Sequence, residues 1–196
     1  MKHRYIIGID EVGRGPLAGP VTIGVVCIPV DFDMSFFVGI KDSKKLGVDS
    51  RRMWRDRVMA CDTAIHSAGT KRQSLSMAWV ASSVSPAVID RIGINASIRR
   101  AMSRALSRLS VAPPQCFVLL DGGLRAPKEY IYQKTIIKGD EKEPVIAIAS
   151  ILAKVYRDTA MERYAERYKQ YGFEAHKGYG TPEHLKKILK HGMSDM

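Results

Sequence analysis

Two apolar segments near the N-terminus, joined by a short glycine-rich turn, constrain the fold more strongly than any other feature of the sequence. The segments RYIIGID (residues 4–10) and PVTIGVVCIPV (residues 20–30) are rich in β-branched residues, which is typical of strands. Glycine and proline bound both segments and interrupt the connection between them, as expected of a turn. The simplest arrangement of two strands joined in this way is a hairpin-like pair.

Strand-like and helix-like segments alternate along the rest of the chain, which predicts an α/β fold. Strands are predicted within residues 76–84, 113–123 and 131–140, and helices within residues 41–60, 95–109, 143–168 and 181–192. In the first helix we expect Met53, Trp54 and Val58 to share one apolar side. Thr181 and Pro182 are typical of the N-cap and first position of the last helix. The strand that ends at Asp121 is almost continuously apolar, so we expect a sheet that helices cover on both faces.

The overall charge indicates the kind of partner that the surface attracts. The formal net charge is +11 at pH 7, and a basic surface of this kind favours a polyanion such as nucleic acid. The three cysteines, Cys27, Cys61 and Cys116, lack metal-ligand spacing and are expected to be free thiols in a reducing compartment. Neither a cleavable leader nor a membrane-length apolar run is recognisable, so we expect a cytoplasmic protein without membrane contact.

Three of the predicted strands end in an aspartate beside a glycine-containing turn. These residues are Asp10, Asp121 and Asp140, and Glu11 follows the first of them directly. Each aspartate alone would be an ordinary turn residue, but strand ends in helix-covered sheets are where functional sites are built. Clustered carboxylates repel one another unless a cation neutralises them, and Mg²⁺ or Mn²⁺ is the natural partner for such oxygen ligands. The sequence therefore predicts a site for divalent metal ions.

A negative pocket on a positive protein is typical of an enzyme that cleaves or transfers phosphodiesters. Two metal ions held by carboxylates can activate water and stabilise the leaving oxygen, while the basic surface binds the remaining backbone. The turn Gly13–Arg14–Gly15 fits this interpretation, because glycines allow close approach of the main chain and the arginine can reach a phosphate. The alternative is a tight connection between two strands. The turn is neither a Walker A loop nor a dinucleotide-binding loop, since the required following residues and helix are missing.

At the level of whole motifs, the chain closely resembles bacterial ribonuclease HII. The matching stretches, in the family's order, are GIDEVGRGPLAGPV, KDSKKL, INASIRRAM, VLLDGG, IIKGD, IASILAKVYRD and HKGYGT. The resemblance implies a single ribonuclease H-like catalytic domain over residues 1–196, with a mixed central β-sheet flanked by helices and a C-terminal helical part over roughly residues 160–196. It also implies a monomeric endoribonuclease that cleaves RNA in RNA–DNA hybrids and incises duplex DNA at embedded ribonucleotides.

The resemblance also assigns roles to individual residues. The family's four catalytic and metal-binding acids correspond to Asp10, Glu11, Asp121 and Asp140, with two Mn²⁺ or Mg²⁺ ions as the implied cofactors. Its Gly-Arg-Gly element, which contacts the nucleotide at the RNA-to-DNA junction, corresponds to Gly13, Arg14 and Gly15, and its junction-sensing tyrosine to Tyr179.

Lysines near these motifs are candidate phosphate contacts, although a solvated surface lysine is the common alternative for each. We assign Lys44 and Lys177 to substrate binding, and favour Lys177 because it lies near Tyr179 in the sequence. Further candidates are Lys41 and Lys154. Asp158 also carries a carboxylate, but its place late in a helix predicts an ion pair or a structural role, so it is not assigned to the acidic site.

Adjacent acids on one strand pose a geometric problem. Side chains at Asp10 and Glu11 point to opposite faces of a regular strand. Our hypothesis is that Asp10 is the central ligand and that Glu11 reaches the metals through a local twist or through its backbone carbonyl. Two other functions remain open from the residues: a two-metal nuclease without a ribose requirement, and a hybrid-binding protein with a degenerate site.

Overall fold

A five-stranded mixed sheet forms the centre of the computed structural model, which describes residues 3–40, 46–67 and 77–196. The strands are β1 (Tyr5–Val12), β2 (Val21–Pro29), β3 (Ala78–Val84), β4 (Cys116–Asp121) and β5 (Gln133–Ile136), in the spatial order β3-β2-β1-β4-β5. Strands β1 and β2 pair antiparallel, as expected of the hairpin, and β3 pairs antiparallel with β2. Strand β4 runs parallel to both β1 and β5. The predicted mixed central sheet is therefore confirmed.

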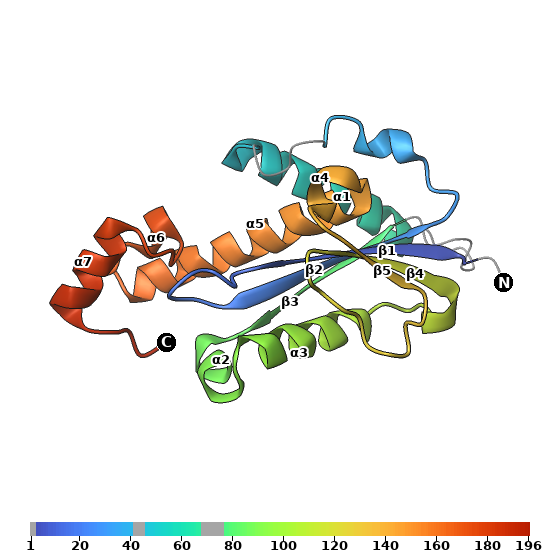
Figure 1. Ribbon diagram of the computed structural model, residues 1–196. Helices are drawn as coiled ribbons and strands as arrows, with labels where there is room; N and C mark the ends of the chain where they lie inside the picture. The colour runs from blue at the N-terminus through green and yellow to red at the C-terminus, as the bar shows by residue number, and fades with distance from the viewer. Residues whose placement is uncertain (1–2, 41–45, 68–76) are drawn as a thin grey trace.

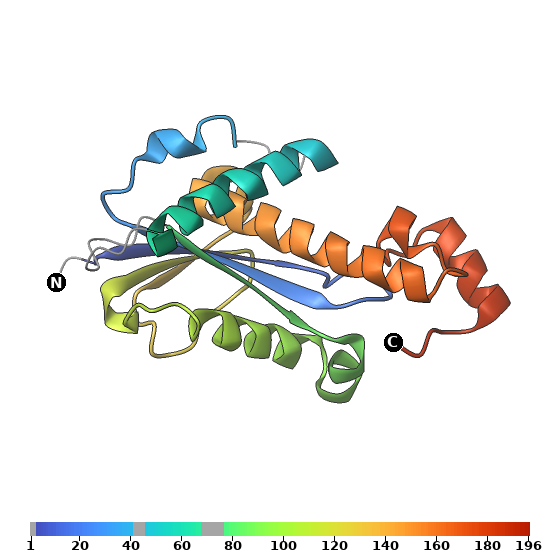
Figure 2. The ribbon, with the colours of Figure 1, turned by 180° about the vertical axis from the view of Figure 1, so that it is seen from behind.

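Helices cover both faces of this sheet. They are α1 (Val48–Ser67), α2 (Pro86–Ile92), α3 (Ile94–Leu106), α4 (Gly139–Lys142), α5 (Pro144–Arg167), α6 (Phe173–His176) and α7 (Pro182–His191), with short 3₁₀ turns at Met34–Phe37 and Pro113–Gln115. Helices α5 and α1 lie on one face and α3 on the other, while α6 and α7 gather at one end of the molecule (Figure 1, Figure 2). Among the described helices, none is both long and apolar enough to cross a bilayer.

The apolar core has one layer on each face of the sheet, and a third cluster lies around Phe173 near the C-terminus. Ile7 and Ile9 of β1 pack toward α3, whereas Leu119 of β4 packs against α5. The prediction that helices cover β4 from both sides is thus confirmed. On α1, Trp54 and Val58 are buried as predicted. The prediction is wrong for Met53, which does not share their buried side and is 57% exposed.

Two glycines allow α5 to lie directly on the backbone of the sheet. A Cβ atom added to Gly8 would come within 2.3 Å of the Val145 carbonyl oxygen, and one added to Gly24 within 2.2 Å of the Ala149 carbonyl oxygen. Gly24 pairs with Asp10 across β1 and β2. The missing side chain therefore brings this part of α5 close to the first of the predicted acids.

Replacing Gly24 with alanine is expected to force α5 away from the sheet. Because its contact is a backbone carbonyl, we expect the free energy of unfolding to fall by about 1–3 kcal/mol, measured by urea denaturation. Gly47→Ala is the matched control, since an added Cβ there meets nothing within 4 Å. Equal stability of the two variants would contradict the proposed close packing.

Candidate active site

Asp10 and Asp121 lie where the pairing between β1 and β4 ends; Asp121 ends β4 as predicted, but β1 continues to Val12, so the predicted strand end at Asp10 is wrong. The last paired residues of β1 and β4 are Ile9 and Leu120, so the two aspartates are the next residues along each strand. Both open onto a cavity of about 310 Å³. Its walls carry the polar side chains of Asp10, Glu11, Asp121, Arg51, Ser150, Lys154 and Tyr179. The structure thus brings three of the four predicted acids together.

Glu11 reaches this cavity although strand alternation is kept. Ile9 packs in the layer beside α3, so Glu11, two residues later, starts on the face opposite Asp10. The pairing of β1 with β4 has ended by this point, and the Glu11 side chain lines the same cavity. Its carboxylate accepts a hydrogen bond from Arg14 Nε at 3.1 Å, and its N–H donates to Asp10 Oδ1 at 2.7 Å. How Glu11 meets a metal ion stays a prediction.

Asp140 lies in a short helix rather than at a strand end, which corrects the sequence prediction. Strand β5 stops at Ile136, and Asp140 is the second residue of α4. The side chain is buried, with 1% exposure. The N–H of Gly139 donates to Asp121 Oδ1 at 2.6 Å. This bond ties the start of α4 to Asp121, whereas Asp140 itself is not among the residues that line the acidic cavity.

Burial and neighbouring carboxylates destabilise the ionised forms of Asp10 and Glu11. Burial raises the pKa of Asp10 to about 7; the charges of Asp121 and Glu11 add to this rise, whereas hydrogen bonds from Ser150 and the Glu11 N–H oppose it. Burial also raises the pKa of Glu11, with Arg14 opposing and Asp121 reinforcing the shift. A cation in the cavity would favour ionisation of these groups. The donor set therefore fits a hard divalent metal ion.

The way in which the predicted acids would hold a metal ion stays a prediction. Within the described ranges, no three His, Cys, Asp or Glu side chains stand close enough together to hold a metal ion as they are.

Two cations from flanking helices also line the cavity. Lys154 on α5 pairs with Asp158 one turn later, Nζ to Oδ1 at 2.7 Å, which confirms the predicted ion-pair role of Asp158. Arg51 on α1 donates to the Leu46 carbonyl. Sequence reasoning missed Arg51 and Ser150. For Ser150 a signal existed, because polar residues recur every four positions, at 150, 154 and 158, along an apolar part of α5.

The Gly-Arg-Gly turn (residues 13–19) docks on the tyrosine loop (residues 177–181). The N–H groups of Leu17 and Ala18 donate to the Gly178 carbonyl at 2.9 and 3.2 Å. Gly13 has a φ of +101°, and an added Cβ would lie 2.4 Å from the Pro20 carbonyl, so glycine is required there. Around Gly15, by contrast, there is open space, which leaves the main chain of the turn accessible.

A buried arginine on α5 connects the turn and the loop. Arg157 has no exposed surface, and its guanidinium donates to the carbonyls of Pro20, Ala18 and Lys177 at 2.9, 3.1 and 2.9 Å. Its Cζ also lies 5.7 Å from the centre of the Tyr179 ring. Sequence reasoning missed this residue, because an arginine late in an amphipathic helix is ordinarily exposed.

The predicted lysine contacts have different outcomes. Lys177 Nζ donates to Glu162 Oε1 at 2.9 Å, and the residue lines a cavity other than the acidic one. Lys44 and Lys41 lie outside the described residues. Lys154, a lesser candidate from the sequence, is the lysine that the fold places in the acidic cavity. Phosphate binding by Lys44 and Lys177 stays a prediction.

Comparison with known proteins supports the motif resemblance over nearly the whole chain. The family profile for Ribonuclease HII matches residues 7–196. The chain belongs to the ribonuclease HII family. A Ribonuclease HII from Bacillus cereus (strain B4264) is 43% identical over 191 residues, which cover 97% of this chain. The chain spans 66% of the length of that relative.

Solved structures share the fold. The ribonuclease H2 from Pyrococcus horikoshii OT3 gives a TM-score of 0.70 at 24% identity, covering 95% of this chain and 85% of that one. The RNase HII from Archaeoglobus fulgidus, determined in a complex with PCNA, gives a TM-score of 0.68 at 25% identity, covering 94% and 86%. The expected ribonuclease H-like fold is confirmed.

Proposed function

We propose that this chain is a metal-dependent endoribonuclease that cleaves the RNA strand of RNA–DNA hybrids and incises duplex DNA at single embedded ribonucleotides. The observation that carries the proposal is the convergence of Asp10, Glu11 and Asp121 on one cavity, in a chain that belongs to the ribonuclease HII family. The net charge of +11 fits a nucleic-acid substrate.

The acids are the proposed metal ligands. Asp10, Glu11, Asp121 and Asp140 would hold two Mg²⁺ or Mn²⁺ ions, for which carboxylate oxygens are suitable donors. When bound, such ions supply a nucleophilic water and stabilise the leaving oxygen, which yields 3′-hydroxyl and 5′-phosphate ends. Burial raises the pKa of Asp10 to about 7, and this supports the assignment because a bound cation would favour the ionised carboxylate.

The neighbouring segments supply substrate recognition. The 2′-hydroxyl distinguishes a ribonucleotide from its deoxy neighbour, and the open main chain around Gly15 can approach it closely. Tyr179, which is 39% exposed and lines the same cavity, offers a flat face and a hydroxyl to the next sugar. Lys154 and Arg14 carry positive charge near the path of the phosphates, and we retain Lys44 and Lys177 as proposed phosphate contacts.

The ribose requirement tests this proposal against a nuclease that ignores the sugar. A DNA duplex with one ribonucleotide is incubated with Mg²⁺ or Mn²⁺, beside the all-DNA duplex and a duplex whose ribonucleotide carries a 2′-O-methyl group. We expect incision of the first substrate only, at the ribonucleotide, with a 5′-phosphate on the downstream fragment. Equal cleavage of the all-DNA duplex would favour the other nuclease class, and binding without incision under either metal would favour a hybrid-binding protein.

A further inference from the structure

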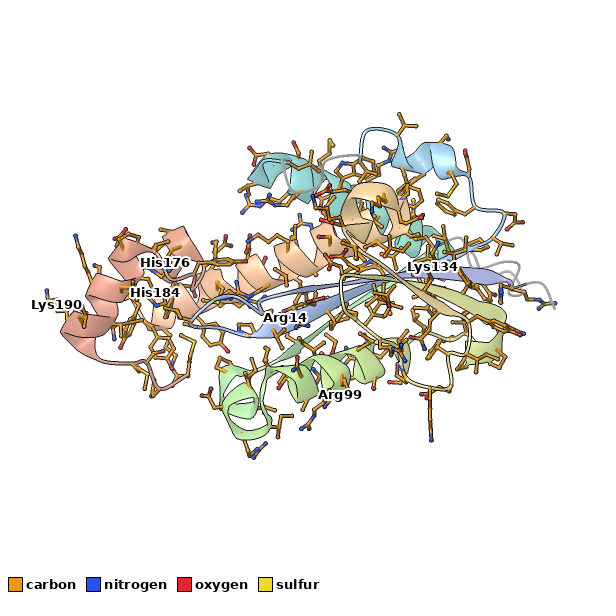
Figure 3. The ribbon with its side chains drawn as sticks, viewed as in Figure 1. Arg14, Arg99, Lys134, His176, His184 and Lys190 are labelled. Atoms are coloured by element: carbon orange, nitrogen blue, oxygen red, sulfur yellow. The ribbon has the colours of Figure 1, made fainter. Side chains whose placement is uncertain are left out.

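Two histidines stack beneath the tyrosine loop. The rings of His176, at the end of α6, and His184, in α7, have centroids 4.3 Å apart and an interplanar angle of 18°. Figure 3 shows the two labelled residues at the end of the molecule that α6 and α7 form. His184 is 1% exposed, and the Phe173 ring packs edge-on against both imidazoles. The pair is therefore a built element of the interior.

The hydrogen-bond partners of the two rings determine their tautomers. The Gly178 N–H lies 3.2 Å from His176 Nδ1, so this nitrogen must carry a lone pair and the ring must be neutral. His176 Nε2 then donates to the Tyr171 carbonyl at 2.9 Å. His184 Nδ1 lies 2.9 Å from the Tyr179 carbonyl, which can only accept, so this nitrogen carries the proton.

The same bonds fix the main chain of Tyr179. Its carbonyl accepts from His184 and also from the Thr181 N–H at 2.8 Å, while its own N–H donates to the His176 carbonyl at 2.9 Å. The N–H of Tyr179 is therefore held by the backbone of His176, and its carbonyl by the ring of His184 and the N–H of Thr181. The ring itself projects to the acidic cavity, 5.7 Å from Lys154 Nζ.

We propose that the stacked His176–His184 pair is the positioning element of Tyr179, and so governs recognition of the ribonucleotide junction rather than bond cleavage. The inference rests on the proposed function, since it takes Tyr179 as a substrate contact. Its physical basis is preorganisation: a loop that is already held in its binding conformation loses less conformational entropy when substrate binds. Neither histidine lines the acidic cavity.

The tautomers can be tested without any catalytic readout. Long-range ¹H–¹⁵N NMR spectra of the folded protein at pH 7.5 distinguish Nδ1–H, Nε2–H and doubly protonated imidazoles. We expect His176 as the Nε2–H form and His184 as the Nδ1–H form. A doubly protonated His176, or an Nε2–H form of His184, would overturn the proposed hydrogen bonds even if the enzyme incises ribonucleotide-containing DNA.

A double-mutant cycle tests the route through Tyr179. His184→Phe keeps a stacked ring but removes the donor, whereas His184→Asn retains an amide donor near the position of Nδ1. We expect His184→Phe to lower kcat/KM for the single-ribonucleotide duplex about tenfold, the effect of one interaction worth about 1.4 kcal/mol, mainly through KM. His184→Asn is expected to retain more of the activity. In a Tyr179→Ala background, His184→Phe should have almost no further effect.

Controls separate the possible failures. Leu189→Ala changes a side chain on the same helix that is 87% exposed, and is expected to leave kcat/KM unchanged. If His184→Phe does not fold, as judged by thermal unfolding, the cycle is repeated with His176→Phe, whose ring is partly exposed. An undiminished effect of the histidine change in the Tyr179→Ala background would refute the positioning role. Failure of the wild type to incise would instead refute the proposed function, and the role of the pair with it.

Discussion

Asp10→Asn is expected to abolish nearly all incision while making the metal-free protein more stable. Loss of one preorganised charged group at a reacting centre costs about 10²–10³-fold in rate, and Asp10 is the proposed central ligand. We expect a decrease of about 10³-fold in kcat on the single-ribonucleotide duplex. Incision by the variant at close to the wild-type rate would contradict the assignment of the site.

The gain in stability follows from the raised pKa of Asp10, which moves from 3.8 to about 7. Between these values the folded state binds more protons than the unfolded state, so the free energy of unfolding of the wild type falls as pH rises. Asparagine does not titrate. The advantage of Asp10→Asn should therefore be absent below about pH 4 and complete above about pH 7, where it is on the order of 4 kcal/mol.

Urea denaturation in EDTA at several pH values measures this difference. Addition of Mn²⁺ provides a second check, because an ion that binds only the folded state stabilises it by mass action. The ion should raise the melting temperature of the wild type and have little effect on Asp10→Asn. A pH-independent stability difference between the two proteins would show that the Asp10 carboxyl is not the source of the effect.

Arg157→Met is expected to have the largest effect on stability. The substitution keeps the length of the side chain but leaves the carbonyls of Pro20, Ala18 and Lys177 without their donor. Buried hydrogen bonds to a charged group contribute about 1.5–3 kcal/mol each to the free energy of unfolding. Part of the loss is offset, because the variant no longer has to bury the guanidinium charge. We expect the free energy of unfolding to decrease by about 3–5 kcal/mol.

The measurement is equilibrium unfolding in urea, with Arg163→Met as the control. Arg163 lies on the same helix and is exposed, so its replacement should change stability by less than about 0.5 kcal/mol. Because Arg157 joins the Gly-Arg-Gly turn to the tyrosine loop, we also expect Arg157→Met to lower incision at single ribonucleotides more than cleavage of long hybrids. Similar stability of the two arginine variants would contradict the structural role of Arg157.

Much of the fold was predictable because its signals are local. Strand periodicity and bounding glycines identified β1 and β2, and Thr181 caps α7 as predicted, accepting from the His184 N–H. The wrong prediction of Asp140 at a strand end also has a local cause. The segment before it is β-branched, but β5 stops at Ile136, and Lys138 adopts a left-handed φ of 55° that leads into α4.

By itself, the sequence determined the types of residue in the candidate site and their order: four acids, a glycine turn and a tyrosine between glycines. Only the tertiary structure decided which of them meet. Glu11 joins Asp10 because β4 pairs with β1 no further than Ile9, while Lys177 pairs with Glu162 instead of entering the acidic cavity. Arg157 is buried because two distant loops present carbonyls to it. Local patterns encode periodicity and charge, whereas such encounters depend on strand register and helix packing between residues far apart in the chain.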